Sequence, residues 1–205
     1  MPPFALPLAV VIAAYLVGSL SFAVIVSRAM KMDDPRSYGS GNPGATNVLR
    51  SGKKIAALLT LLGDTLKAVI AVAVARYMAL PDPWLAGVAV AVTVGHMWPL
   101  FFGFRGGKGV ATAAGVLLVL DWRLGLATLA VWLIVAAVSK ISSLAALIAA
   151  IAAPIVAYLL MPARMPIVGA VLVIAALLIQ RHKRNLLNLI SGQEGRIGDK
   201  AQPKQ

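Results

Sequence analysis

Long apolar segments are the feature that most constrains what this chain can fold into. Charged residues gather in the short stretches between these segments. The apolar runs cover residues 4–26, 55–80, 84–102, 110–120, 122–138, 142–160 and 166–180. Inside a bilayer every backbone amide must find its hydrogen bond within the protein, so such runs form helices or a closed barrel. Their length and their lack of alternation between apolar and polar residues favour helices.

The composition also indicates an integral membrane protein. Hydrophobic residues make up 60% of the chain and charged residues 13%, and the mean hydropathy is +0.87. Because no basic segment precedes the first run and no cleavage site follows it, we interpret residues 4–26 as a retained transmembrane helix. We expect one all-α transmembrane domain over residues 1–192 and a polar cytoplasmic tail over residues 193–205.

The basic residues decide between two topologies. The run at 110–120 covers roughly half of a ~30 Å hydrocarbon core and could be fused with the next run, giving six spans. With seven spans and an outside N-terminus, only Arg76, Arg123 and Arg164 lie outside and Lys67 lies within a span. All other Lys and Arg residues then lie inside, as membrane proteins prefer. Six spans would divide the basic residues almost evenly, so we predict seven transmembrane helices with a cytoplasmic C-terminus.

Several classes of function are excluded by what the chain lacks. The net charge of +12 suggests nucleic acid, but the basic residues have no interleaved aromatics and fit cytoplasmic loops better, so we expect no nucleic-acid partner. There are no cysteines, the two histidines fit no zinc pattern, and the seven acidic residues form no cluster. We therefore expect no metal and no cofactor. Gly109 follows Lys108 where a P-loop needs Ser or Thr.

The first of two glycine-rich basic loops runs from Ser37 to Arg50. Its glycines allow backbone conformations closed to other residues, its small polar side chains can hydrogen-bond an oxyanion or a polyol, and Arg50 can bind phosphate bidentately. The alternative is an ordinary solvated loop. The residues that we assign to substrate binding here, besides Arg50, are Ser40, Gly41, Asn42, Gly44, Thr46 and Asn47.

The second loop places Lys108 among three glycines, Gly106, Gly107 and Gly109, directly before a helix predicted to begin near residue 110. Free N–H groups and the positive end of the helix dipole favour an anion at such a position. Thr112 lies one turn inside that helix. The alternative is a basic cytoplasmic connection without a binding role.

Polar residues near the other spans complete the candidate site. His182 and Asn185 are three apart, so they share a helical face on the same side of the membrane as both loops, although cations near them are often only membrane anchors. Asp64 and Lys67 are also three apart, and a mutual ion pair that orients the helix is the interpretation we favour over a direct function. His96 is either a hydrogen-bonding packing residue or a base.

These motifs resemble the bacterial acyl-phosphate:glycerol-3-phosphate acyltransferases of the PlsY type, over nearly the whole chain. The resemblance is carried by residues 39–50, by residues 95–96 with 104–112, and by His182 and Asn185 followed by Glu194. Asn188 stands where the family typically has Arg.

The resemblance implies seven helices and transfer of a fatty acyl group from acyl phosphate to the 1-hydroxyl of glycerol 3-phosphate, giving lysophosphatidic acid at the cytoplasmic face of a bacterial inner membrane. It implies a first step in phospholipid synthesis, with the enzyme that produces acyl phosphate as a candidate partner. By motif, Ser40, Arg50, Lys108, His182 and Asn185 are catalytic, and Asp64, Lys67, His96 and Glu194 are supporting residues. The substrate phosphate is a candidate proton acceptor.

Two other functions stay open at this point. An anion transporter could use the same loops as a permeation site, although transporters usually show repeated halves and helices broken at the membrane midplane. A lipid-binding membrane protein without enzymatic activity is the other alternative.

Overall fold

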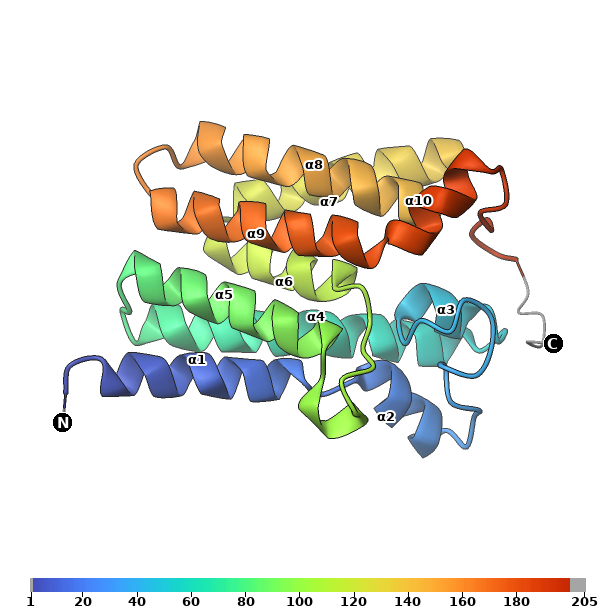
Figure 1. Cartoon of the computed structure of the whole chain (residues 1–205), viewed down its shortest axis with the longest axis horizontal. Helices are drawn as coiled ribbons and strands as arrows, with labels where there is room; N and C mark the ends of the chain where they lie inside the picture. The colour runs from blue at the N-terminus through green and yellow to red at the C-terminus, as the bar shows by residue number, and fades with distance from the viewer. Residues whose placement is uncertain (1, 200–205) are drawn as a thin grey trace.

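The computed structural model describes residues 2–199, so the last part of the expected tail, residues 200–205, lies outside the described residues. All regular elements in the described range are helices, which confirms the all-α prediction (Figure 1). In chain order they are α1 (Ala5–Gly18), α2 (Phe22–Ala29), α3 (Ala45–Leu49), α4 (Lys54–Tyr77), α5 (Asp82–Met97), the 3₁₀ helix η1 (Leu100–Phe102), α6 (Val110–Leu120), α7 (Trp122–Ser139), α8 (Ser142–Leu160), α9 (Met165–Arg181) and α10 (Lys183–Ile190).

Several helices are long and apolar enough to cross a membrane. α4, α7, α8 and the segment Asp82–Phe102 each meet this requirement alone. Two bent pairs meet it when joined: α1 with α2, bent by 44°, and α9 with α10, bent by 57°. The apolar helix α6 is shorter, with 11 residues. The described residues thus hold four to six candidate spans by length, and the seventh crossing stays a prediction.

The fourth and fifth apolar runs form two separate helices rather than one fused helix. The chain reverses at Asp121, whose carboxylate accepts hydrogen bonds from the backbone N–H groups of Arg123 (2.8 Å) and Leu124 (3.4 Å). This contact caps the N-terminus of α7, where four backbone N–H groups have no partner within the helix. α6 and α7 therefore run in opposite directions (Figure 1).

The first apolar run is also interrupted, because the chain bends between α1 and α2 at residues 19–21. The backbone carbonyl of Leu20 accepts a 2.6 Å hydrogen bond from the ammonium group of Lys67 on α4. A carbonyl freed by a break in a membrane helix needs such a partner. The predicted single span over residues 4–26 is therefore wrong as a continuous helix.

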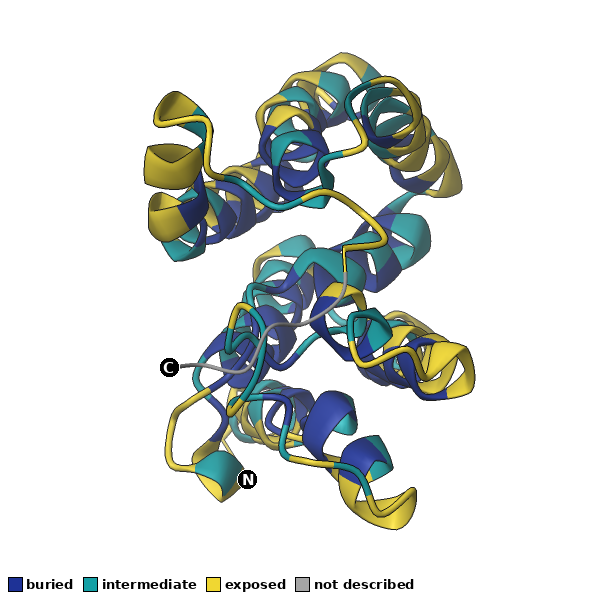
Figure 2. Ribbon diagram, turned by 90° about the vertical axis from the view of Figure 1, so that its right-hand side faces the viewer, coloured by how far each residue is buried: buried dark blue, intermediate teal, exposed yellow. Residues whose placement is uncertain are grey.

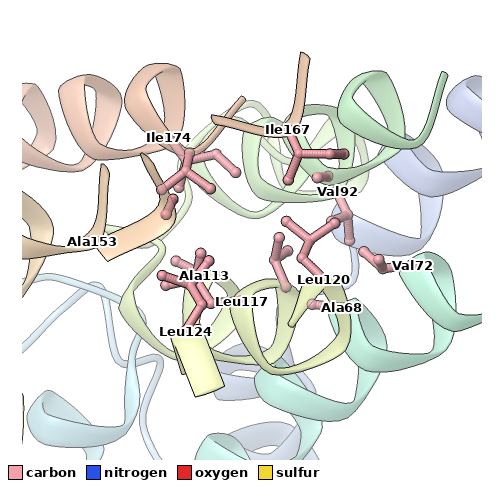
Figure 3. Close-up of a cluster of buried hydrophobic side chains, with 14 of the residues drawn as sticks. Ala68, Val72, Val92, Ala113, Leu117, Leu120, Leu124, Ala153, Ile167 and Ile174 are labelled. Atoms are coloured by element: carbon pink, nitrogen blue, oxygen red, sulfur yellow. The ribbon is translucent and has the colours of Figure 1, made fainter. Parts of the chain in front are cut away.

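Small residues allow the helices to pack closely in a common core. A Cβ atom on Gly18 of α1 would overlap the Val92 carbonyl of α5, and one on Gly95 would overlap the Tyr15 carbonyl. Such close backbone approach is typical of helix pairs in membranes. Figure 3 shows the core around Val72, Val92, Leu117, Leu120 and Ile167, contributed by α4, α5, α6 and α9. Seen along the bundle (Figure 2), α1–α5 and α7–α10 form two groups with α6 between them.

Candidate functional site

A cleft of about 740 Å³ is lined by residues from both of these groups of helices and from α6. Most of its wall is apolar and comes from α4, α6, α7, α8 and α9, with Leu61, Leu117, Leu129 and Ile174 as examples. One end of the cleft is instead polar, and it is formed by the two glycine-rich loops, α10 and the segment that follows α10. A cavity of this size and lining can hold a flexible apolar chain along its wall and a polar group at its polar end.

The polar end of the cleft brings together most of the predicted site residues from segments far apart in the sequence. The five predicted catalytic residues all line it: Ser40, Arg50, Lys108, His182 and Asn185. Of the predicted binding and supporting residues, those that line it are Asn42, Gly44, Thr46, Asn47, Gly109, Asp64, His96 and Glu194.

The other predicted residues lie beside this cleft. Gly41 and Gly106 line a separate basic cavity of about 250 Å³, which also includes Arg36, Arg105 and Arg181. Thr112 is buried, and its hydroxyl donates to the Asp64 carbonyl (3.1 Å). Gly107 and Lys67 also do not line the cleft.

A chain of hydrogen bonds connects Lys108 to the C-terminal segment. The Lys108 ammonium donates to the side-chain oxygen of Asn185 (2.5 Å), and the Asn185 amide donates to Glu194 (2.5 Å). Glu194 also accepts from the hydroxyl of Ser143 at the start of α8 (2.7 Å). Burial lowers the pKa of Lys108 to about 8; nearby Glu194 opposes this shift, whereas Arg50 and Arg181 add to it. Lys108 is therefore a cation at neutral pH that is held in place at the cleft.

Arg50 is the second cation of the cleft, and its side chain is incompletely paired. Its Nε atom is buried and has no hydrogen-bond partner among the described residues. A buried guanidinium N–H without a partner is costly, and a phosphate or carboxylate oxygen would satisfy it. An anionic ligand therefore fits this position.

Asn47 fixes the shape of the first loop. Its side-chain oxygen accepts from the backbone N–H of Ser40 (2.9 Å), and its amide donates to the carbonyls of Pro35 (2.7 Å) and Tyr38 (3.2 Å). The loop also contacts α8, since the hydroxyls of Thr46 and Ser142 are 3.3 Å apart. Asn47 thus uses its polar atoms to shape the loop. The Ser40 hydroxyl has no hydrogen-bond partner among the described residues, and Ser40 lines the cleft.

Gly107 in the second loop is required by packing. Its backbone N–H donates to the His96 carbonyl (3.2 Å), so this amide is already used within the protein. A Cβ atom at Gly107 would overlap the His96 ring and lie 3.0 Å from the Pro43 carbonyl. At Gly109, which precedes α6 and lines the cleft, the backbone φ of +89° favours glycine.

His182 lies at the bend between α9 and α10, and its side chain is buried. Its Nδ1 atom is 2.8 Å from the Leu178 carbonyl. A carbonyl accepts only, so Nδ1 carries the proton and Nε2 is left as an acceptor. His182 can therefore accept a hydrogen bond from a substrate hydroxyl.

Sequence reasoning missed two residues that shape this site. Ser143 lies in an apolar run with no motif around it, and only the tertiary structure brings it to Glu194. Arg181 stands 5.3 Å from the Trp98 ring centroid and donates to the carbonyls of Gly106 (2.8 Å) and Gly107 (3.2 Å). Its position near the end of a span resembles that of an ordinary membrane anchor, so no local signal distinguishes it. Within residues 2–199, no group of three or more His, Cys, Asp or Glu residues is placed to hold a metal ion.

Comparisons with known proteins agree on one family. The family model described as glycerol-3-phosphate acyltransferase matches residues 8–192. Glycerol-3-phosphate acyltransferases of Chromobacterium violaceum and Thiobacillus denitrificans are 56% and 59% identical to this chain, over 94% and 95% of its length and 95% and 98% of theirs.

Two crystal structures are also similar. Both are of PlsY, an integral membrane glycerol 3-phosphate acyltransferase, one in the glycerol 3-phosphate form and one in the lysophosphatidic acid form. They match with TM-scores of 0.89 and 0.87 at 37% and 36% identity, over 95% of this chain and 96% of theirs.

Proposed function

Because this chain belongs to the glycerol-3-phosphate acyltransferase family, we propose that it transfers a fatty acyl group from acyl phosphate to the 1-hydroxyl of sn-glycerol 3-phosphate, giving lysophosphatidic acid and phosphate. The family resemblance inferred from the motifs is confirmed by the comparisons. The acyl phosphate donor and the position of the acylated hydroxyl belong to the proposal.

One observation carries this proposal: a single cleft joins a cationic, hydrogen-bonding end to a long apolar wall. Both substrates carry phosphate, and the donor also carries a fatty chain. Arg50 and Lys108 supply positive charge at the polar end, and the buried Nε of Arg50 needs an acceptor. The leucine-lined part of the cleft offers apolar surface against which an acyl chain can pack.

The chemistry requires little activation of the acyl donor, because an acyl phosphate is a mixed anhydride with a good leaving group. The 1-oxygen of glycerol 3-phosphate attacks the acyl carbon, a new ester bond forms, and the bond between the acyl carbon and the phosphate oxygen breaks. The hydroxyl proton passes to a phosphate oxygen. In this scheme Nε2 of His182 orients the attacking hydroxyl, while Arg50 and Lys108 stabilise the negative charge that develops on the departing phosphate.

We further propose seven crossings with the N-terminus outside and this cleft at the cytoplasmic face of a bacterial inner membrane. Fifteen of the basic residues then lie inside, and α6 crosses as a short helix. Such a site would receive soluble glycerol 3-phosphate from the cytoplasm and the fatty donor from the membrane. An enzyme that makes acyl phosphate is the corresponding partner.

The test uses purified protein in detergent or vesicles with acyl phosphate and glycerol 3-phosphate. We expect equal amounts of lysophosphatidic acid and inorganic phosphate. Failure to form lysophosphatidic acid, together with movement of an unchanged substrate across the vesicle membrane, would support the transporter alternative instead.

A further inference from the structure

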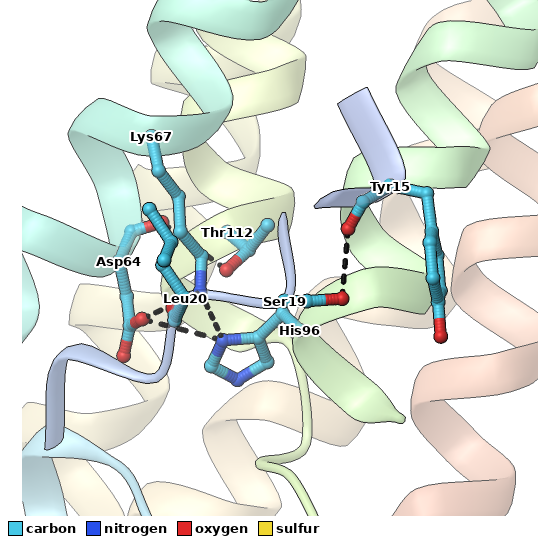
Figure 4. A network of polar contacts seen from close by, with 7 residues as sticks. All are labelled: Tyr15, Ser19, Leu20, Asp64, Lys67, His96 and Thr112. Atoms are coloured by element: carbon cyan, nitrogen blue, oxygen red, sulfur yellow. Dashed lines mark hydrogen bonds and ion pairs between the residues drawn. The ribbon is translucent and has the colours of Figure 1, made fainter. Parts of the chain in front are cut away.

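Three buried ionisable residues, Asp64, Lys67 and His96, form a closed cluster between α4 and α5 (Figure 4). Their side chains are 3%, 2% and 5% exposed, in that order. The Lys67 ammonium lies 2.8 Å from an Asp64 oxygen, 2.6 Å from the Leu20 carbonyl and 3.0 Å from Nδ1 of His96. The expected ion pair between Asp64 and Lys67 is thus present, but the cluster also includes a histidine that faces the cleft.

The cluster determines which nitrogen of His96 carries the proton. Nδ1 also lies 3.4 Å from an Asp64 oxygen, but the Lys67 ammonium is closer, at 3.0 Å. A charged lysine has three donors and no acceptor, so this approach requires Nδ1 to accept from Lys67 rather than to donate to Asp64. The other two donors of Lys67 are used by Asp64 and by the Leu20 carbonyl. A neutral imidazole then has its proton on Nε2. Lys67 therefore holds His96 as the Nε2–H tautomer.

Nε2 of His96 points away from the cluster (Figure 4) and toward the junction of the two glycine-rich loops. Of the atoms around Gly107, Nε2 lies nearest to the position that a Cβ would occupy, and the Pro43 carbonyl of the first loop is also close. No hydrogen bond from Nε2 is present among the described residues, and His96 lines the cleft. The Nε2–H thus lies at the junction of the two loops, on a residue that lines the cleft, and has no hydrogen-bond acceptor among the described residues.

From this arrangement we propose that the Nε2–H of His96 donates a hydrogen bond to a phosphoryl oxygen of substrate, and that Lys67 is the positioning residue that fixes this tautomer. The inference rests on the proposed function, since it assumes phosphate-bearing substrates in the cleft. A neutral N–H donor in the same cleft as the cations Arg50 and Lys108 can orient a bound anion without adding charge.

Two substitutions separate this role from simple packing. His96→Asn keeps an oxygen near the position of Nδ1, which can still accept from Lys67, but it removes the donor directed at the cleft. His96→Gln places an amide N–H near the position of Nε2. We expect His96→Asn to lose roughly tenfold to a hundredfold in kcat/KM, the range for a hydrogen bond to a charged group, and His96→Gln to retain clearly more.

Both variants must purify as folded protein with unchanged melting temperatures. An equal loss of kcat/KM in the two variants, or a smaller loss in His96→Asn than in His96→Gln, would then overturn the proposal. Separate KM values for glycerol 3-phosphate and for acyl phosphate show which substrate supplies the phosphoryl oxygen. The proposal requires at least one of them to rise in His96→Asn.

The tautomer can be observed directly, because the chain has only two histidines. In ¹⁵N-histidine spectra we expect His96 to be protonated at Nε2 and His182 at Nδ1, with His96→Gln assigning the signals. The double variant Asp64→Asn/Lys67→Met, which leaves no unpaired charge, should lose the single tautomer of His96. Protonated Nδ1 of His96 in the wild type would overturn the proposal.

A binding measurement keeps this inference distinct from the proposed function. Stabilisation by inorganic phosphate, followed as a shift in melting temperature, should be smaller in His96→Asn than in the wild type. If the wild type makes no lysophosphatidic acid, the proposed function fails, whereas the phosphate shift and the spectra still decide the role of His96. An equal phosphate shift in both proteins would contradict the inference.

Discussion

The ammonium group of Lys108 donates a 2.5 Å hydrogen bond to the side chain of Asn185, a residue 77 positions later in the chain. This bond joins the second glycine-rich loop to α10, and Asn185 is in turn held by Glu194. Two segments that are separated by three long helices thereby share one polar site.

Replacing Asn185 with Ala should remove the support that orients Lys108. We expect kcat/KM to fall by roughly tenfold to a hundredfold, because hydrogen bonds to charged groups contribute about 1.5–3 kcal/mol. Asn188 is the matched control, since it lies on the same helix with an exposed side chain. Steady-state rates for Asn185→Ala and Asn188→Ala measure the difference, and similar activity in both would show that the bond to Lys108 is dispensable.

Arg50 should be needed as a guanidinium rather than as a mere positive charge. Its buried Nε lacks a partner among the described residues, so a phosphate that binds there can use two N–H groups at once. Arg50→Lys should therefore remain severely impaired, because an ammonium cannot reproduce this fork. Lys53→Ala, at an exposed residue nearby, should keep normal rates. Near-normal turnover by Arg50→Ala would remove Arg50 from the site.

Activity should decline at alkaline pH because of Lys108. Burial lowers its pKa to about 8, so the side chain is a cation below this pH and loses its charge as the pH rises further. We expect kcat/KM for glycerol 3-phosphate, which reports the free enzyme, to fall above about pH 8. In Lys108→Arg the charge persists, so any remaining activity should lack this decline. A profile for the wild type that stays flat through pH 9.5 would contradict the assignment.

Alanine at Gly107 should reduce activity strongly while the protein still folds. The added methyl group would meet the His96 ring and the Pro43 carbonyl, so the loop must move and carry Lys108 with it. Misplacement of a catalytic group by about 1 Å costs on the order of a hundredfold in rate. Gly169 in α9 is the control, because nothing lies within 4 Å of a Cβ there. Rates within threefold of wild type for Gly107→Ala would refute this account of the loop.

Cysteine labelling can test whether α6 crosses the membrane. The chain has no native cysteine, and Ser51 and Ala163 are exposed on connections before α4 and after α8. If α4, α5, α6, α7 and α8 all cross, Ala163→Cys should react from outside intact cells, and Ser51→Cys only after permeabilisation. Labelling of both residues from the same side would mean that α6 does not cross.

The amino-acid sequence determined the class of fold and predicted most of the residues that meet at the cleft. Apolar runs must become helices in a bilayer, and the ends of α6, α7 and α8 follow the predicted runs because Asp121 and Lys140 interrupt them. The glycine-rich loops predicted an anion site, since glycine and fixed cations are local properties of sequence. The loops and the family motifs together predicted thirteen of the residues that line the cleft, from Ser40 in the first loop to Glu194 after α10.

Only the tertiary structure decided how these residues act on one another. The break between α1 and α2 depends on Lys67, which reaches Leu20 from another helix, and the need for glycine at position 107 depends on the His96 ring. The partnership of Ser143 with Glu194 likewise joins segments that share no local pattern. Hydrogen bonds and close contacts act over a few ångströms in space, whatever the separation in the chain. Sequence periodicity therefore predicts the helices, while packing alone selects the partners.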